Sequence, residues 1–196
     1  MLLFLVFLAA GTITNFGIGG EGVIILDAGH GGNDPGAMYG GVNEKDINLT
    51  VTEKTAEILL REGYQVVMTR GTDDFVELSE RAGISNRRRG ALFVSIHCNA
   101  SENLQTYGLE TYCARGSEEG RDLAEILYRE IRKTTDAEKR GVFERDFVVL
   151  KETRCPAALV EIGFLSNAAE RQKLQEEGYQ KKIAEGIAKG IKEALK

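Results

Sequence analysis

Short apolar runs and longer amphipathic stretches alternate along this chain. The first apolar run, Val23 to Leu26, is soon followed by the turn Gly29-His30-Gly31-Gly32, a pattern typical of a buried strand that ends in a tight turn. Similar apolar or alternating stretches recur later in the sequence. They predict six strands, at roughly residues 22–27, 64–69, 91–97, 107–114, 146–150 and 157–162.

Between these strands, apolar residues recur at helical spacing. The clearest case is residues 118–133, where Leu123, Leu127 and Ile131 lie four residues apart and form one apolar face. Another helix is expected to begin near Asn43, because acidic residues follow it in the first turn, where the helix dipole favours them. The pattern predicts five helices, at roughly residues 43–62, 76–89, 118–133, 167–176 and 180–195.

Strands that alternate with helices predict an α/β fold. We expect a single open, mostly parallel twisted sheet of about six strands, with helices on both faces. Residues 29–43 are expected to form a loop, because Asp34-Pro35-Gly36 and Gly40-Gly41 are turn signals. No internal repeat or linker interrupts residues 21–196, so we interpret this range as one domain.

Composition narrows the classes of function. Of the 196 residues, 42% are hydrophobic and 28% are charged, which is ordinary for a globular protein. The net charge of −5 argues against a nucleic-acid partner, since such proteins normally present a basic surface. The three cysteines, Cys98, Cys113 and Cys155, are odd in number and lack CxxC spacing, so they predict neither a disulfide framework nor a structural zinc site.

Residues 1–20 differ from the rest of the chain because they carry no charge. The unbroken apolar run from Leu2 to Ala10 is too short for an ordinary membrane span but fits the apolar core of a signal peptide. A basic segment before this core is missing, and the whole uncharged stretch could instead serve as a membrane anchor or as a buried strand or helix. We expect a signal peptide or N-terminal membrane anchor and export to the cell envelope, either periplasmic or extracellular.

Candidate chemistry gathers at the ends of predicted strands. The only two histidines of the chain, His30 and His97, each follow an apolar strand, and Glu161 ends another. Ligands of open parallel sheets bind beyond the carboxyl ends of the strands, so these three residues are expected to share a site that Glu44, at a helix start, can join. Two imidazoles and one carboxylate are a common ligand set for a catalytic zinc ion, and a second carboxylate can act as a general base.

The residues around these four positions strengthen that hypothesis. Taken together and in this order, they resemble the zinc-dependent N-acetylmuramoyl-L-alanine amidases of the Amidase_3 type, over about residues 22–194. Met68-Thr69-Arg70 with the following Asp73 also looks like the second strand of that family. The resemblance is carried by Asp27-Ala28-Gly29-His30-Gly31-Gly32, Asn43-Glu44-Lys45-Asp46-Ile47-Asn48-Leu49, Ser95-Ile96-His97-Cys98-Asn99-Ala100 and Val160-Glu161-Ile162-Gly163-Phe164-Leu165-Ser166-Asn167.

The resemblance implies a function and a role for each residue. It implies that His30, Glu44 and His97 bind one zinc ion and that Glu161 is the catalytic acid and base. The implied substrate is bacterial peptidoglycan, and the implied reaction cleaves the amide between the lactyl group of N-acetylmuramic acid and L-alanine. The chain shows no recognisable cell-wall-binding repeat that would target it to the cell wall, so a regulatory protein partner could supply this targeting.

Two rival functions stay open at this point. One is a zinc peptidase that cuts within the stem peptide, and the other is a non-catalytic cell-wall-binding module that keeps the fold. The stretch between the strands predicted at 107–114 and 146–150 is short for an inserted helix that would block the site, so we expect an open groove.

Overall fold

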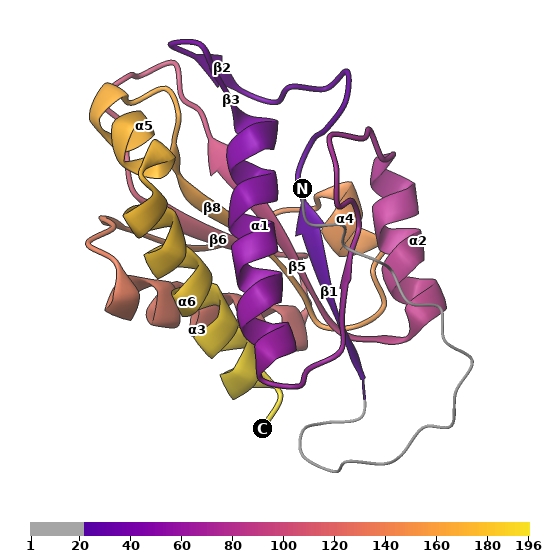
Figure 1. Ribbon diagram of the computed structural model, residues 1–196. Helices are drawn as coiled ribbons and strands as arrows, with labels where there is room; N and C mark the ends of the chain where they lie inside the picture. The colour runs from indigo at the N-terminus through magenta and orange to yellow at the C-terminus, as the bar shows by residue number, and fades with distance from the viewer. Residues whose placement is uncertain (1–21) are drawn as a thin grey trace.

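The computed structural model describes residues 22–196, and the N-terminal segment predicted at residues 1–20 lies outside this range. A central sheet of six strands organises the described chain (Figure 1). From one edge to the other, the strands are β4 (Val66–Met68), β1 (Val23–Ala28), β5 (Gly90–Asn99), β8 (Ala157–Phe164), β6 (Leu109–Cys113) and β7 (Lys139–Glu144). The first four are parallel to one another, whereas β6 runs antiparallel to β8 and parallel to β7.

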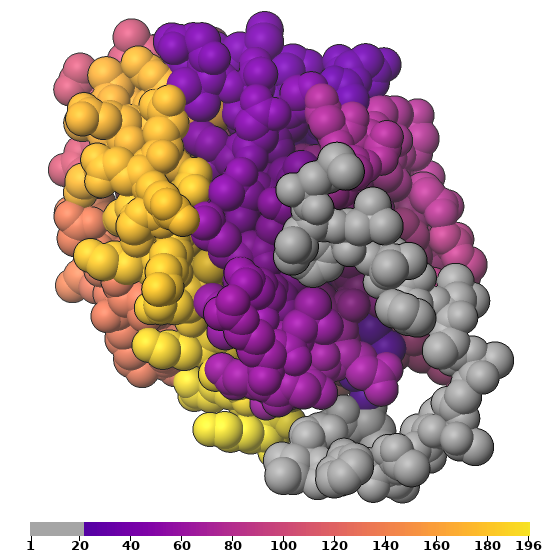
Figure 2. Space-filling model, viewed as in Figure 1, coloured from indigo at the N-terminus to yellow at the C-terminus, as the bar shows by residue number. Residues whose placement is uncertain are grey.

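Helices cover both faces of this sheet, as the sequence predicts. On one face, α1 and α6 lie side by side and α3 packs against α6 (Figures 1 and 2). On the other face, α2 and α4 pack against each other. Helix α5 lies beside β8 and α6, and its Leu174 belongs to the same core cluster as the buried residues of α1, α3 and α6. The helices are α1 (Glu44–Arg61), α2 (Leu78–Arg88), α3 (Glu118–Thr134), α4 (Val148–Lys151), α5 (Ala168–Gln175) and α6 (Glu177–Ala194). None of the described helices is both long and apolar enough to span a membrane.

One predicted strand is wrong. The apolar run Val148-Val149-Leu150 lies in α4, a single helical turn that buries Val149 and Leu150 in the smaller core cluster. A short apolar run does not by itself distinguish a strand from a buried helical turn. The sixth strand of the sheet is instead β7, which ends shortly before this run in the sequence. It lies at the sheet edge and is mostly exposed and charged, so it has no apolar run that would predict it.

The loop expected at residues 29–43 contains a small hairpin. Its two strands, β2 (Met38–Tyr39) and β3 (Val42–Asn43), pair antiparallel directly before α1. The turn between them is formed by Gly40 and Gly41, which both have positive φ angles and so suit glycine. The hairpin therefore leads the chain into the first turn of α1, where Glu44 lies.

The alternation of side chains along the strands decides which residues reach the site. On β5, Ile96 and Cys98 belong to the larger core cluster beneath α1, α3 and α6, so His97 between them points to the opposite face. On β8, Val160 and Ile162 belong to the same cluster, so Glu161 points to the face of His97. The position of Cys98 in the core also confirms that it points away from the neighbouring histidine.

Candidate metal centre and catalytic site

His30 begins the site in a turn that follows β1. Its φ angle of 61° is unusual for a residue with a side chain, and the next two residues, Gly31 and Gly32, also have positive φ angles. This turn ends the strand abruptly and directs the imidazole back towards the carboxyl edge of the sheet. Nδ1 of His30 lies 2.7 Å from Oδ2 of Asp34, so the ring is oriented by a carboxylate four residues later.

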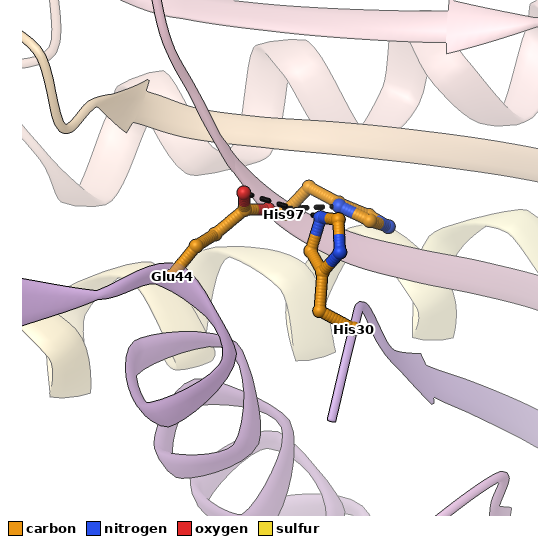
Figure 3. A group of neighbouring side chains, drawn as sticks. All are labelled: His30, Glu44 and His97. Atoms are coloured by element: carbon orange, nitrogen blue, oxygen red, sulfur yellow. Dashed lines mark hydrogen bonds and ion pairs between the residues drawn. The ribbon is translucent and has the colours of Figure 1, made fainter. Parts of the chain in front are cut away.

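Glu44, at the start of α1, points its carboxylate towards both histidines (Figure 3). One of its carboxylate oxygens, Oε2, is 3.2 Å from Nε2 of His30, and the other, Oε1, is 2.9 Å from Nδ1 of His97. The two imidazole rings meet edge to face, with their centroids 4.9 Å apart. Three residues that are distant in the sequence, from β1, α1 and β5, thus converge on one point.

Two glycines allow this close approach. A Cβ atom at Gly29 would lie 2.2 Å from Cε1 of His97, and one at Gly36 would lie 2.6 Å from both His30 and Glu44. Real Cβ atoms do not come this near, so a larger residue at Gly29 would displace His97 and one at Gly36 would displace His30 or Glu44. The convergence depends on the turn glycines as much as on the converging residues.

The charges at this point stabilise one another. Burial alone would raise the pKa of Glu44, but the hydrogen bonds and charges of His30 and His97 hold it well below its usual range. Burial alone would lower the pKa of His30, but Glu44 and Asp34 outweigh that effect and raise it. Glu44 is therefore ionised, as a metal ligand must be.

The donor set fits a metal ion. One ligand atom from each of His30, Glu44 and His97 can be chosen so that all three lie within 4.8 Å of one another. Two imidazole nitrogens and one carboxylate oxygen are ligands that a catalytic zinc ion uses, with a further position for water. The three residues predicted as ligands are thus brought together into a group that could hold a metal ion.

Glu161 lies beside this group on the neighbouring strand. Its Cα atom is paired in register with that of His97, and its side chain is on the same face of the sheet. Its Oε2 atom is buried and has no hydrogen-bond partner in the described chain. Burial raises the pKa of Glu161 well above its usual range, and the charges of Glu44 and Glu110 raise it further.

Comparison with known proteins identifies the family. The family model described as N-acetylmuramoyl-L-alanine amidase (Amidase_3) matches residues 24–193, which include all four candidate residues. The chain belongs to this amidase family. The uncharacterized protein YqiI of Bacillus subtilis (strain 168) is 39% identical over 170 residues, which cover 86% of this chain and 82% of that protein.

Solved structures of related amidases share the fold. The catalytic domain of CwlV, an amidase from Bacillus (Paenibacillus) polymyxa var. colistinus, superposes with a TM-score of 0.86 at 37% identity, covering 89% of this chain and 98% of that one. The CwlD amidase from Clostridioides difficile, in complex with the GerS lipoprotein, gives 0.86 at 36% identity with the same coverage. Several curated relatives, an endolysin and three amidases, are longer, and the present chain spans 34% to 68% of their length.

Other polar residues of this amidase domain support the site but were not predicted to do so. Asp34 orients His30, although the sequence Asp34-Pro35-Gly36 indicates only a turn. Asn48 donates hydrogen bonds to Oε1 of Glu44 at 3.1 Å and to the carbonyl of Gly29 at 3.2 Å. Its position four residues after Glu44, on the same helix face, is the signal that could have identified it.

A second polar cluster lies next to Glu161. Glu110 is paired in register with Glu161, and it accepts hydrogen bonds from Asn99 at 2.7 Å and from Tyr112 and Arg140, each at 2.5 Å. Asn99, which follows His97 by two residues, is therefore held by Glu110. The helix between β6 and β7 is α3, which packs against α6 on the opposite face, so it does not block the site in the described chain.

Proposed function

We propose that this chain hydrolyses the amide bond between N-acetylmuramic acid and L-alanine in bacterial peptidoglycan, with one zinc ion held by His30, Glu44 and His97. Membership of the amidase family supports the reaction and the substrate. The observation that carries the proposal is the position of Glu161, a buried carboxyl group with an unpartnered oxygen beside a group that could bind a metal ion.

The protein residues have separate tasks in this reaction. Asp34 holds Nδ1 of His30, which leaves Nε2 for the metal ion, and Asn48 holds the carboxylate of Glu44. A bound zinc ion supplies Lewis-acid chemistry, because it acidifies a water molecule and polarises a carbonyl group. The two histidines and Glu44 therefore fix where hydrolysis takes place.

Glu161 handles the proton in the proposed mechanism. It takes a proton from the water as the oxygen attacks the amide carbon, and it gives that proton to the alanine nitrogen as the C–N bond breaks. The products are a lactyl carboxylate and a free L-alanine amino group. The surroundings of Glu161 raise its pKa above that of an ordinary carboxyl group, so the side chain holds a proton more readily, which suits the transfer from water to the leaving nitrogen.

The substitution Glu161→Gln tests this role. It removes the base while keeping the size of the side chain and all three proposed ligands, so we expect zinc content to stay at one ion and hydrolysis to fall by about 10²-fold or more. The measurement is zinc content by atomic spectroscopy together with amide cleavage on purified muropeptides.

The exposed acid Glu102 provides a matched control, and Glu102→Gln should leave both quantities unchanged. Full activity in Glu161→Gln would remove Glu161 from the mechanism. Product analysis distinguishes the rival functions: a cut within the stem peptide would indicate a peptidase, and no turnover by zinc-loaded wild-type protein would indicate a binding module.

The proposed substrate also predicts where the protein acts. We propose an extracytoplasmic location, because the substrate of this family is the cell wall. The structure of the C. difficile CwlD amidase in complex with a lipoprotein gives a precedent for a protein partner. Fractionation of cells that express the full chain tests the location, and recovery of the protein only in the cytoplasm would contradict it.

A further inference from the structure

Two buried arginines hold the backbone turn that carries His30. The carbonyl of Ala28 accepts hydrogen bonds from Nε of Arg70 at 2.9 Å and from Nη1 of Arg81 at 2.6 Å. The next two carbonyls are held in the same way, Gly29 by Nη2 of Arg70 at 3.0 Å and His30 by Nη2 of Arg81 at 2.8 Å. Three consecutive carbonyls thus accept hydrogen bonds from side-chain donors, and the last of them belongs to His30, whose backbone is in the left-handed region.

Arg70 does more than hold this turn, because it joins the turn to the helix that carries Glu44. Nη2 of Arg70 also donates to the carbonyl of Lys45, the residue after Glu44, at 2.9 Å. One guanidinium nitrogen therefore binds the His30 turn and the first turn of α1 at the same time. The planar geometry of the guanidinium group fixes the distance between the two segments, which a flexible ammonium group would not do.

No ion pair within the described chain explains why this arginine is buried here, although the carboxylates of Asp27, Asp73 and Asp46 favour its charged form. Arg81 forms an ion pair with Asp27 at 2.8 Å, whereas every hydrogen bond of Arg70 within the described chain goes to a backbone carbonyl. Arg70 is only 4% exposed, and its positive charge beside the site opposes the binding of a metal cation. A guanidinium that weakens the attraction for a cation must contribute to the site through geometry.

We propose that Arg70 is a positioning residue of the metal centre, whose guanidinium group sets the separation of the His30 turn from the start of α1. It thereby brings His30 and Glu44 to the spacing that a metal ion needs before the ion arrives. This inference rests on the proposed function, because it takes His30 and Glu44 as zinc ligands. It adds a buried residue that forms no hydrogen bond with the side chains of the three proposed ligands.

Two substitutions separate geometry from charge. Arg70→Lys keeps the charge and loses the planar fork, and Arg70→Met loses both. If Arg70 acts through geometry, both variants bind zinc at least about 10-fold more weakly than the wild type, the range found for residues that orient metal ligands. If only its charge matters, Arg70→Lys binds like the wild type and Arg70→Met binds zinc more tightly.

The experiment is a zinc titration of the full chain against a chromophoric chelator, with the thermal unfolding of each zinc-free variant measured in parallel. Ile187→Val serves as the control for general destabilisation, because Ile187 is fully buried in α6 on the opposite face of the sheet. It should lower the unfolding temperature and leave zinc affinity unchanged. If Arg70→Met does not fold, Arg70→Lys decides the question.

The outcomes distinguish this inference from the proposed function. Failure of the wild-type protein to bind zinc would overturn the proposed function, and the role of Arg70 with it. Zinc binding by the wild type with equal or tighter binding by both Arg70 variants would overturn this inference alone. Weaker binding by both variants, without the same loss in Ile187→Val, would support it.

Discussion

At the scale of single residues, the site depends on side chains that orient other side chains. His30 and Glu44 are each held by a polar neighbour, Asp34 for the imidazole and Asn48 for the carboxylate. Such partners set which nitrogen or oxygen faces the metal ion, and removing one typically weakens metal binding 10- to 100-fold. The positions of these neighbours are as much a part of the site as the ligands themselves.

The substitution Asp34→Ala tests this dependence. Without the carboxylate 2.7 Å from Nδ1, the imidazole of His30 loses the group that holds its orientation, and we expect zinc affinity to fall by about 10-fold or more. Competition with a chelator of known affinity measures the change.

Asp34→Asn provides the graded control. Asparagine keeps the side-chain oxygen that accepts a hydrogen bond from the backbone N–H of Gly36 at 3.1 Å, but it loses the negative charge. We expect an effect between those of wild type and Asp34→Ala. Unchanged zinc affinity in both variants would show that His30 needs no such partner.

At the scale of elements, α6 is held close to α3 by glycines. A Cβ atom at Gly186 would lie 2.6 Å from the backbone Cα of Ile131 in α3, and one at Gly190 would lie 3.1 Å from the Cα of Leu127. The two helices can pack at this distance only because α6 lacks side chains there. The apolar pattern of each helix predicts its buried face, but how closely α3 and α6 approach depends on the residues of both helices.

Alanine substitutions at two glycines of α6 should therefore have opposite effects. Gly186→Ala should lower the free energy of unfolding by about 1–3 kcal/mol, because the new methyl group meets backbone that cannot move without separating the helices. At Gly178, a Cβ atom would meet nothing within 4 Å, so Gly178→Ala should raise the free energy of unfolding by up to about 1 kcal/mol. Urea unfolding measures both, and equal effects would contradict the close packing.

At the scale of the whole molecule, one buried carboxylate connects several parts of the sheet. Asp27 on β1 is fully buried and accepts hydrogen bonds from Thr69 and Ser95, both at 2.6 Å, and from Arg81 of α2 at 2.8 Å. Burial alone would raise the pKa of Asp27, but the charge of Arg81 and the hydrogen bonds of Ser95 and Thr69 lower it below its ordinary value of 3.8. The carboxylate therefore stabilises the folded state in its ionised form.

This stabilisation should depend on pH in a defined direction. Because the pKa of Asp27 is lower in the folded state, its contribution is present above the unfolded-state pKa near 3.8 and is lost as the pH falls through the folded-state value. Asp27→Asn leaves Arg81 buried without its carboxylate, so it should cost about 3–5 kcal/mol at pH 7.

Urea unfolding between pH 7 and pH 2.5 tests this direction. The difference in unfolding free energy between wild type and Asp27→Asn should narrow in acid, because the wild-type protein loses the contribution that the variant already lacks. Asp122→Asn, at an exposed position of α3, should stay close to wild type throughout. A difference that is small at pH 7, or one that widens in acid, would contradict the role of Asp27.

The sequence predicts much of this fold because most strands are buried runs. β1, β5 and β8 each lie in the interior of the sheet, so each shows an apolar run that identifies it. β7 could not be predicted in the same way, since an edge strand with charged side chains has little to bury. β6 and β7 run in the opposite direction to the other four strands. This direction depends on how the chain returns to the sheet, and no local sequence pattern predicts it.

The sequence by itself determined most of the elements, the family and the three residues that form a possible metal-binding group. Two histidines follow apolar runs and Glu44 begins a helix, and strand ends meet at one edge of a parallel sheet, so the convergence of these three residues could be inferred from the sequence. The tertiary structure alone decided how the turn that carries His30 is held. Arg70 and Arg81 are far from this turn in the sequence, so their hydrogen bonds to its carbonyls form only after the turn, the helix and the sheet have packed together.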